Sequence, residues 1–273
     1  MPLSGGLWNG SAATDIAEHV LLNMAILYVA SDAMELEPFA ALLTGLRKLK
    51  WPIDYAYEGV LEGRRVMLAA NGAGPKLAAQ AVEVAVRAVT VAELSSSKLE
   101  AVVSTGYCGA LDPSLRESQI VAAIEVRDLD TNEAFECAPV TTDREFVSGR
   151  ILSQNRIANS AMEKQQLKEY GALAIDMEAA GVAARTKRAG LPFYCIKVVS
   201  DRADESFPLN INDMRTPDGR IGRVKIVVHA LTHPKLIPYL FQLKRRSEDA
   251  AKALRDFLGS CRIKPSPDAP QVE

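Results

Sequence analysis

Residues 172–205 restrict the fold of this chain more than any other stretch of the sequence. The apolar runs at 172–175 and 193–200 are typical of buried strands, and residues 177–189 between them have the composition of a helix. A strand, a helix and a second strand in this order form the repeating unit of a parallel sheet. If the two strands are neighbours in such a sheet, the carboxylates that follow them meet at the edge where α/β sheets place their active sites.

Three carboxylates in this stretch are candidates for that edge. Asp201 ends an apolar strand, where side chains project into an α/β cleft; the structural alternative is a turn carboxylate paired with Arg202. Glu178 lies in the first turn of its helix, where an acidic side chain also stabilises the helix dipole, and Asp176 is placed to cap that helix. Spacing alone therefore selects Asp201 and leaves both a structural and a functional role open for Glu178.

Two further strands end in glycine-containing turns that we expect at the same edge. The strand at 66–70 runs into Gly72, and the strand at 101–104 runs into Gly106. The first turn resembles a dinucleotide fingerprint, but Leu77 stands where the third glycine of GxGxxG belongs, and the GxxxxGK[ST] pattern is absent. These turns either reverse the chain without a ligand or present amides to a ribose, a phosphate or water. No cofactor is expected.

Strand and helix patterns alternate along most of the chain, which indicates one α/β domain at 24–258. Extended segments at 119–127 and 135–142 predict the wall of a strongly curved or partly closed sheet. Residues 1–23 are predicted to be an N-terminal extension, and the Pro-rich residues 259–273 are predicted to be a flexible tail.

Composition excludes several classes of function. Because 32 Lys and Arg residues face 34 Asp and Glu residues, the chain lacks the basic excess that nucleic-acid binding needs. No apolar run approaches the roughly 18 residues of a membrane span, and no secretory leader is evident. The scattered cysteines form no CxxC pair, which argues against a disulfide framework or a Cys-rich zinc site. A cytoplasmic protein with a small-molecule partner is therefore expected.

The C-terminal region carries two further patterns. His229 and His233 have the spacing of metal ligands, but Pro234 breaks the helix and no third ligand is evident, so both are interpreted as structural and no metal is expected. In the helix predicted at 235–258, apolar residues precede the basic 244–246, a pattern that could rest on a bilayer surface. The alternative is an amphipathic helix that closes the core or forms an oligomer interface.

Several segments together carry a family resemblance. AIDMEAAGVA and IKVVSDRAD resemble the DMEAA and ISD signatures of the purine nucleoside phosphorylase and methylthioadenosine/S-adenosylhomocysteine nucleosidase superfamily. Upstream, SDAMELE resembles the GAMEEE segment of the nucleosidases, NGAGPKLAA resembles their SGIGKVNAA, and VVSTGYCGALDPSL resembles their VNTGSAGGL. The resemblance implies a single α/β domain around a mixed, distorted sheet, assembled as a homo-oligomer.

The resemblance also implies roles for individual residues. Asp201 would protonate N7 of a purine base, while Glu37, the last glutamate of the GAMEEE-like segment, would polarise the attacking water. Glu178 would accept hydrogen bonds from the ribose hydroxyls, and Met177 would pack against the sugar. The other expected pocket residues are Gly72, Gly106, Tyr107, Ile157 and Ser200.

The identity of the nucleophile depends on the second glycine turn. Bacterial phosphorylases of this superfamily resemble RVGSCGA there and hold phosphate with the arginine, where this chain has Ser104. With Glu37 present, water is the expected nucleophile, although Arg64, Arg65 or a partner subunit could still supply a cation for phosphate. A nucleosidase is expected, a phosphorylase is the alternative, and an inactive nucleoside-binding or assembly protein on the same fold is a third reading.

The pocket departs from the usual nucleosidase pattern. Tyr107 replaces the small serine of TGSAGG, and Ile157 stands where nucleosidases resembling SGDAFI place an aromatic residue that stacks on the base. SQNRIANSAMEKQQLKEYGALAIDMEAAGVA and SDRADESFPLNINDMRTPDGRIG are similar to the hopanoid-associated phosphorylase-like proteins. That similarity implies cleavage of adenosylhopane to adenine and ribosylhopane, with a lipid 5′ group and weak contact of the C-terminal helix with a membrane surface. Methylthioadenosine or S-adenosylhomocysteine is the alternative substrate.

Overall fold

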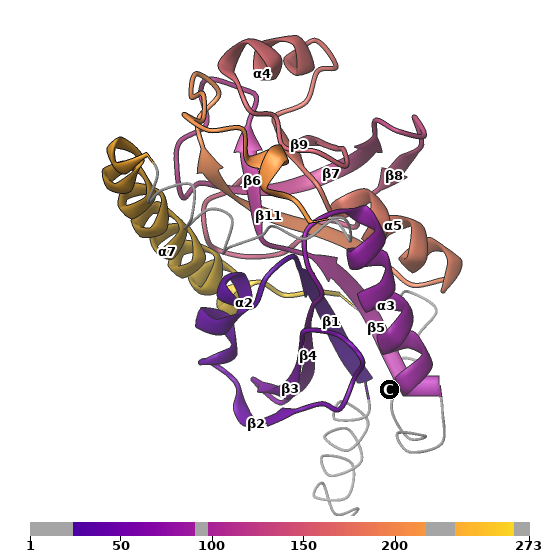
Figure 1. Cartoon of the computed structure of the whole chain (residues 1–273). Coiled ribbons are helices and arrows are strands. Elements are labelled where there is room, and N and C mark those ends of the chain that lie inside the picture. The colour runs from indigo at the N-terminus through magenta and orange to yellow at the C-terminus, as the bar shows by residue number, and fades with distance from the viewer. Residues whose placement is uncertain (1–23, 91–97, 217–232, 265–273) are drawn as a thin grey trace, which may run out of the picture.

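The computed structural model of the chain describes residues 24–90, 98–216 and 233–264 (Figure 1). The expected N-terminal extension lies outside these ranges, as do the last residues of the expected tail and His229.

An 11-stranded mixed sheet runs through the molecule in the order β2-β3-β4-β1-β5-β11-β6-β10-β9-β7-β8. Its strands are β1 (Met24–Ala30), β2 (Thr44–Lys48), β3 (Tyr55–Leu61), β4 (Arg64–Ala70), β5 (Lys98–Ser104), β6 (Tyr107–Ala110), β7 (Ile120–Asp128), β8 (Ala134–Glu136), β9 (Val147–Ser153), β10 (Ala174–Asp176) and β11 (Phe193–Asp201). The α-helices are α2 (Ala33–Ala40), α3 (Pro75–Thr90), α4 (Ala161–Lys168), α5 (Ala179–Arg188) and α7 (Ile237–Ser260), and the short 3-10 helices are η2 (Ile211–Met214) and η3 (Pro234–Leu236).

One half of the sheet is covered by helices on both faces (Figure 1). In β1, Leu27 and Val29 pack into the cluster that includes residues of α3 and α5, whereas Ile26 and Tyr28 pack into the cluster that includes residues of α2 and α7. Both faces of β1 are therefore buried, which is why the strand is a continuous apolar run rather than an alternating one.

The other half of the sheet closes on itself. β11 pairs in parallel with β6, β6 pairs antiparallel with β10, and β10, β9 and β7 follow one another in parallel. β7 then pairs back onto β11 in antiparallel orientation, with Ile196 opposite Ala122. These five strands form a closed ring, so the prediction of a mixed, partly closed sheet flanked by helices is confirmed.

The expected pairing of the strands at 172–175 and 193–200 is wrong. β6 lies between β10 and β11 and runs parallel to β11 but antiparallel to β10. The carboxylates at their ends still come together, because β10 has only 3 residues and because Ile175 and Asp201 both pair with Gly109 of β6. The carboxylates therefore meet because β10 and β11 share β6 as a neighbour, and not because β10 and β11 are adjacent parallel strands.

The C-terminal boundary also differs from the prediction. Residues 259–264 were expected in a flexible tail, but α7 continues into this segment and the chain then packs on the sheet. Arg64 donates a hydrogen bond to the carbonyl of Ile263 at 2.6 Å, and the hydroxyl of Tyr194 donates one to the carbonyl of Lys264 at 3.0 Å. Because Ile263 is also buried, this segment belongs to the domain.

Candidate active site

A cavity of about 230 Å³ opens beside the closed ring of strands. Strand ends, loops, α4 and α7 contribute its walls, so residues far apart in the sequence meet there. The predicted residues that line it are Tyr107, Ile157, Met177, Glu178, Ser200 and Asp201. The structure thus brings most of the predicted site together.

Asp201 lies at the end of β11, where the pairing with β6 shifts register. Its side chain is buried, and its Oδ1 accepts a hydrogen bond from the hydroxyl of Ser200 at 2.7 Å. A Cβ atom on Gly109 would lie 2.9 Å from Oδ2, so a side chain at that position would displace the carboxyl group. Burial raises the pKa of Asp201 above its ordinary value, although contact with Lys164 acts in the opposite direction.

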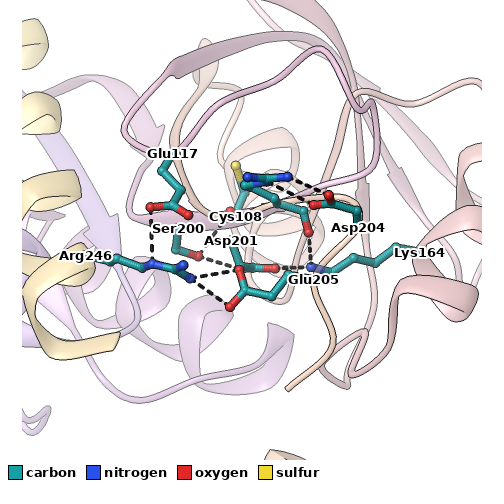
Figure 2. Close-up of polar contacts among 9 residues, drawn as sticks. Cys108, Glu117, Lys164, Ser200, Asp201, Asp204, Glu205 and Arg246 are labelled. Carbon is teal, nitrogen blue, oxygen red and sulfur yellow. Dashed lines mark hydrogen bonds and ion pairs between the residues drawn. The ribbon is translucent and has the colours of Figure 1, made fainter. Parts of the chain in front are cut away.

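The second oxygen of Asp201 binds a lysine that the sequence reasoning missed. Lys164 on α4 is only 1% exposed, forms an ion pair with Asp201 Oδ2, and donates a hydrogen bond to the carbonyl of Arg202 at 2.6 Å (Figure 2). The hydroxyl of Ser160 caps α4, and Lys164 shares the buried face of this short helix with Leu167. No local sequence pattern marks Lys164 as a residue of the site, because its burial and its contact with Asp201 arise only in the folded chain.

The structure contradicts the expected position of Glu37, because Glu35 enters the cavity instead. Glu35 is 3% exposed and lines the cavity, whereas Glu37 is exposed and does not. Asp32 and Glu35 form a capping box at the start of α2, so the carboxylate of Glu35 turns back toward the preceding chain. Two residues advance a helix by about 200°, which turns Glu37 to the opposite face.

The carboxylate of Glu35 occupies a nest of hydrogen-bond donors. It accepts bonds from the N–H groups of Ser31, Asp32 and Tyr107 at 2.8, 2.9 and 2.8 Å, and from the hydroxyl of Ser31 at 2.7 Å. Gly106 makes this possible, because its φ is +108° and a Cβ atom there would lie 2.6 Å from Glu35 Oε1. Burial raises the pKa of Glu35, and the positive charge of Lys197 opposes that rise.

Glu178 meets the first glycine turn. Its Oε1 accepts a hydrogen bond from the N–H of Gly74 at 2.9 Å, so this amide of the turn binds a carboxylate of the protein itself and not the ribose, phosphate or water expected from the sequence. The close approach of α5 to α3 depends on Gly181, since a Cβ atom there would lie 2.0 Å from the carbonyl oxygen of Pro75. Gly72 shapes the turn with a φ of +106° but does not line the cavity.

A fully buried lysine lies behind these carboxylates. Lys197 Nζ is 2.7 Å from Asp176 Oδ2 and donates a hydrogen bond to the carbonyl of Thr105 at 2.9 Å. Asp176 Oδ2 also accepts the N–H of Ala179, the first residue of α5, at 2.9 Å, although the N-cap position itself is occupied by Glu178. Burial raises the pKa of Glu178, while Lys197 opposes the rise and Asp176 adds to it.

Tyr107 and Ile157 are both held in place by hydrogen bonds. The hydroxyl of Tyr107 donates to the carbonyl of Ser247 on α7 at 2.9 Å, so its ring joins β6 to that helix. The N–H and the carbonyl of Ile157 are both bonded to the side chain of Asn212, at 2.8 and 3.0 Å. These contacts hold two walls of the cavity in place.

α7 also joins the loops around the cavity. Arg246 forms ion pairs with Glu205 at 2.7 Å and with Glu117 at 3.2 Å (Figure 2). On the same helix, Phe241 is 70% exposed. None of the helices in the described ranges is long and apolar enough to cross a bilayer, and no group of three or more metal-binding side chains is placed to hold an ion there.

Comparison with known proteins finds similarity in both sequence and structure. A family model described as the phosphorylase superfamily matches residues 131–216. The 5′-methylthioadenosine/S-adenosylhomocysteine nucleosidase of Haemophilus ducreyi is 25% identical over 219 residues, which cover 70% of this chain and 91% of that protein. A nucleosidase of the same description from Staphylococcus aureus is 24% identical over 175 residues, which cover 54% of this chain and 73% of that protein.

Solved structures share the fold at low sequence identity. The Helicobacter pylori nucleosidase complexed with a pyrrolidine-based compound has a TM-score of 0.63 at 16% identity and covers 88% of this chain and 97% of its own. The futalosine hydrolase of the same organism has a TM-score of 0.62 at 17% identity and covers 89% and 97%. The chain is therefore similar in part of its sequence to the phosphorylase superfamily and over most of its length to methylthioadenosine/S-adenosylhomocysteine nucleosidases, whose fold it shares.

Proposed function

We propose that this protein is a nucleosidase that hydrolyses the N-glycosidic bond of an adenosine-type nucleoside and releases adenine. The observation that carries the proposal is the presence of two buried carboxyl groups, Asp201 and Glu35, in the lining of one cavity. Glycosidic hydrolysis with water needs one carboxyl group as acid and a second as base. The nucleosidase descriptions of the relatives agree with this chemistry.

Asp201 is the proposed acid. To donate a proton to N7 of the purine as the bond to the ribose breaks, Asp201 must be protonated at that moment, a state that burial favours and that contact with Lys164 opposes. Glu178 is the proposed acceptor for the ribose hydroxyls, and its negative charge would also stabilise the positive charge that develops on the sugar. Met177 lies beside it in the cavity wall and supplies an apolar surface for the sugar.

Glu35 takes over the proposed role of Glu37 as the group that polarises the attacking water. Its carboxylate already occupies backbone amides of the kind that bind phosphate, and its negative charge would repel that anion. The two arginines considered for phosphate are engaged elsewhere: Arg64 with Glu100 at 2.6 Å and Arg65 with Glu58 at 2.9 Å. These contacts favour water over phosphate as the nucleophile.

The specific substrate we propose is adenosylhopane. The similarity of two long segments to the hopanoid-associated proteins supports it. The cavity of about 230 Å³ is smaller than the roughly 300–1,000 Å³ of typical ligand pockets, so a polycyclic 5′ group would have to extend outside it. Leu243 of α7 lines the cavity, and Ile237 and Phe241 of the same helix are exposed apolar surface for such a group.

Methylthioadenosine or S-adenosylhomocysteine is the second candidate, because the sequence relatives carry that description. The test is adenine release from adenosylhopane, methylthioadenosine and S-adenosylhomocysteine, each with and without phosphate. Asp201→Asn, which removes the transferable proton, is expected to lower kcat/KM by about 10²-fold or more. Full activity of that variant would contradict the assignment of the acid, and a strict requirement for phosphate would contradict hydrolysis.

A further inference from the structure

Lys164 is a buried cation in the cavity lining that the roles above leave unused. We propose that Lys164 positions Asp201 and supplies, through it, the proton that the leaving base takes up. The proposal rests on the proposed function of the cavity as a nucleosidase site and extends it to the source of the proton.

The contacts of Lys164 converge on the acid. Its ammonium group pairs with Asp201 Oδ2, donates a hydrogen bond to the carbonyl of Arg202 at 2.6 Å, and lies 5.5 Å from the centre of the Phe207 ring. A buried ion pair is a weak source of stability, because removing both charges from water costs about as much as their attraction returns. The position of Lys164 beside the proposed acid is therefore better explained by a role in the reaction than by a contribution to the stability of the fold.

The charged groups around this ion pair influence the ionisation of Asp201. Burial is the largest cause that raises the pKa of Asp201, and Glu205, in the loop after β11, adds to it, while Lys164 and the hydroxyl of Ser200 lower it. Asp204 of the same loop also interacts with Lys164. When the contact with Lys164 ionises Asp201, the proton that the leaving base needs can come through the hydrogen bond that the Lys164 ammonium group donates to Asp201 Oδ2. An arginine in the same place would not give up a proton at any ordinary pH.

The bond between C1′ and N9 breaks, and its electron pair passes to the purine. A proton moves from Lys164 Nζ to the Asp201 carboxylate, and the Asp201 carboxyl group passes a proton to N7. The water oxygen bonds to C1′ while its proton passes to Glu35. Solvent then returns a proton to Lys164 and accepts the one on Glu35, which restores the starting enzyme.

The first test compares two leaving groups that carry the same 5′-substituted ribose. Lys164→Met is expected to lower kcat/KM for adenine release by about 10²-fold. Release of p-nitrophenolate, which departs without being protonated, is expected to change by about threefold or less, since the proposed loss concerns proton donation alone. Equal losses for both leaving groups would overturn the proposal and leave Lys164 with a structural role.

A second pair of measurements separates proton supply from charge and packing. Lys164→Arg keeps the positive charge but is expected to remain slow with adenine, because arginine does not release its proton. Lys164→Ala is expected to recover adenine release when small primary alkylamines are added, and more acidic ammonium ions should be more effective. Full activity of the arginine variant, or absence of rescue by amines in a folded alanine variant, would overturn the proposal.

These outcomes are distinguishable from failure of the proposed function. A wild-type protein that releases no adenine contradicts the nucleosidase assignment. An active wild-type protein whose Lys164→Met variant releases adenine equally well contradicts the role of Lys164 alone.

Discussion

The carboxylate of Glu35 is held by backbone amides from two separate strand ends, the one after β1 and the start of β6. This arrangement orients the carboxylate without relying on any flexible side chain other than that of Ser31. Such preorganisation is what a group that polarises water needs, because no reorientation is required during the reaction.

Substitution of Glu35 tests its assignment against that of Glu37. Glu35→Gln keeps the size of the side chain but removes the charge, and is expected to lower kcat for adenine release by about 10²–10³-fold. Glu37→Gln is the matched control on the exposed face of α2, and its activity is expected to equal that of the wild type.

The reverse pattern, with Glu37→Gln inactive and Glu35→Gln active, would show that α2 is oriented differently in the working enzyme. Steady-state kinetics with circular dichroism on both variants would separate loss of catalysis from loss of folding.

Among the elements, α7 connects the cavity to the rest of the domain. Its C-terminal half is buried, with Leu254, Phe257 and Leu258 in the core cluster, whereas its N-terminal half extends past the cavity (Figure 1). Arg246 lies between these halves and ties the helix to two loops. The helix therefore acts both as a core element and as a cavity wall.

Removal of the Arg246 ion pairs has a predictable effect on stability and on KM. Arg246→Gln is expected to lower the free energy of unfolding by about 1 kcal/mol, because the ion pairs are only partly buried. For a chain of this size that corresponds to a decrease in Tm of about 2–4 °C. KM is also expected to rise more than kcat falls, since Leu243 and Ser247 of the same helix line the cavity.

Arg245→Gln provides the matched control one residue away. The Arg245 side chain is 85% exposed, so its replacement is expected to leave both Tm and KM unchanged. Thermal unfolding and steady-state kinetics on the two variants measure both effects. The same Tm and KM for the two variants would show that the Arg246 ion pairs do not hold α7 in place.

In the molecule as a whole, the buried ionisable groups around Lys197 make the free energy of unfolding depend on pH. Desolvation raises the pKa of Glu178 from 4.5 to about 7 in the folded protein. The folded state therefore binds the Glu178 proton more tightly than the unfolded state does. The stabilising contribution of the protonated group is fully present below pH 4.5 and is lost as the pH rises through about 7.

Glu178→Gln should remove this pH dependence, because glutamine imitates the protonated carboxyl group. At pH 8 the variant is expected to exceed the wild type in free energy of unfolding by on the order of 2–3 kcal/mol, and the difference should vanish near pH 4.5. Urea unfolding at a series of pH values measures it, with the exposed Glu37→Gln as control. A difference that does not vary with pH would contradict the predicted titration.

Assembly into a homo-oligomer remains a prediction at this scale. Light scattering on the purified protein would determine the number of subunits. Contact of the exposed part of α7 with a membrane surface also remains a prediction, which liposome flotation would test.

Much of the fold could be predicted from the sequence, because the strands β1, β4, β5 and β11 each contain a run of buried, mainly apolar residues and are closed by, or followed within two residues by, a glycine or a carboxylate. β2 and β9 were missed for the opposite reason. Every residue of β2 is exposed, and β9 begins with partly exposed or exposed residues, so neither has the apolar pattern of a buried strand.

The sequence by itself determined the alternating α/β architecture, the resemblance to the superfamily and six of the residues that line the cavity, since these depend on local composition and on ordered motifs. Only the tertiary structure decided the order of the strands, the choice of Glu35 over Glu37 and the pairing of Lys164 with Asp201. Strand order depends on long-range pairing, and the identity of a buried carboxylate depends on the rotation of its helix against the sheet. A contact between residues 37 positions apart has no local signature, because it exists only once the chain has folded around it.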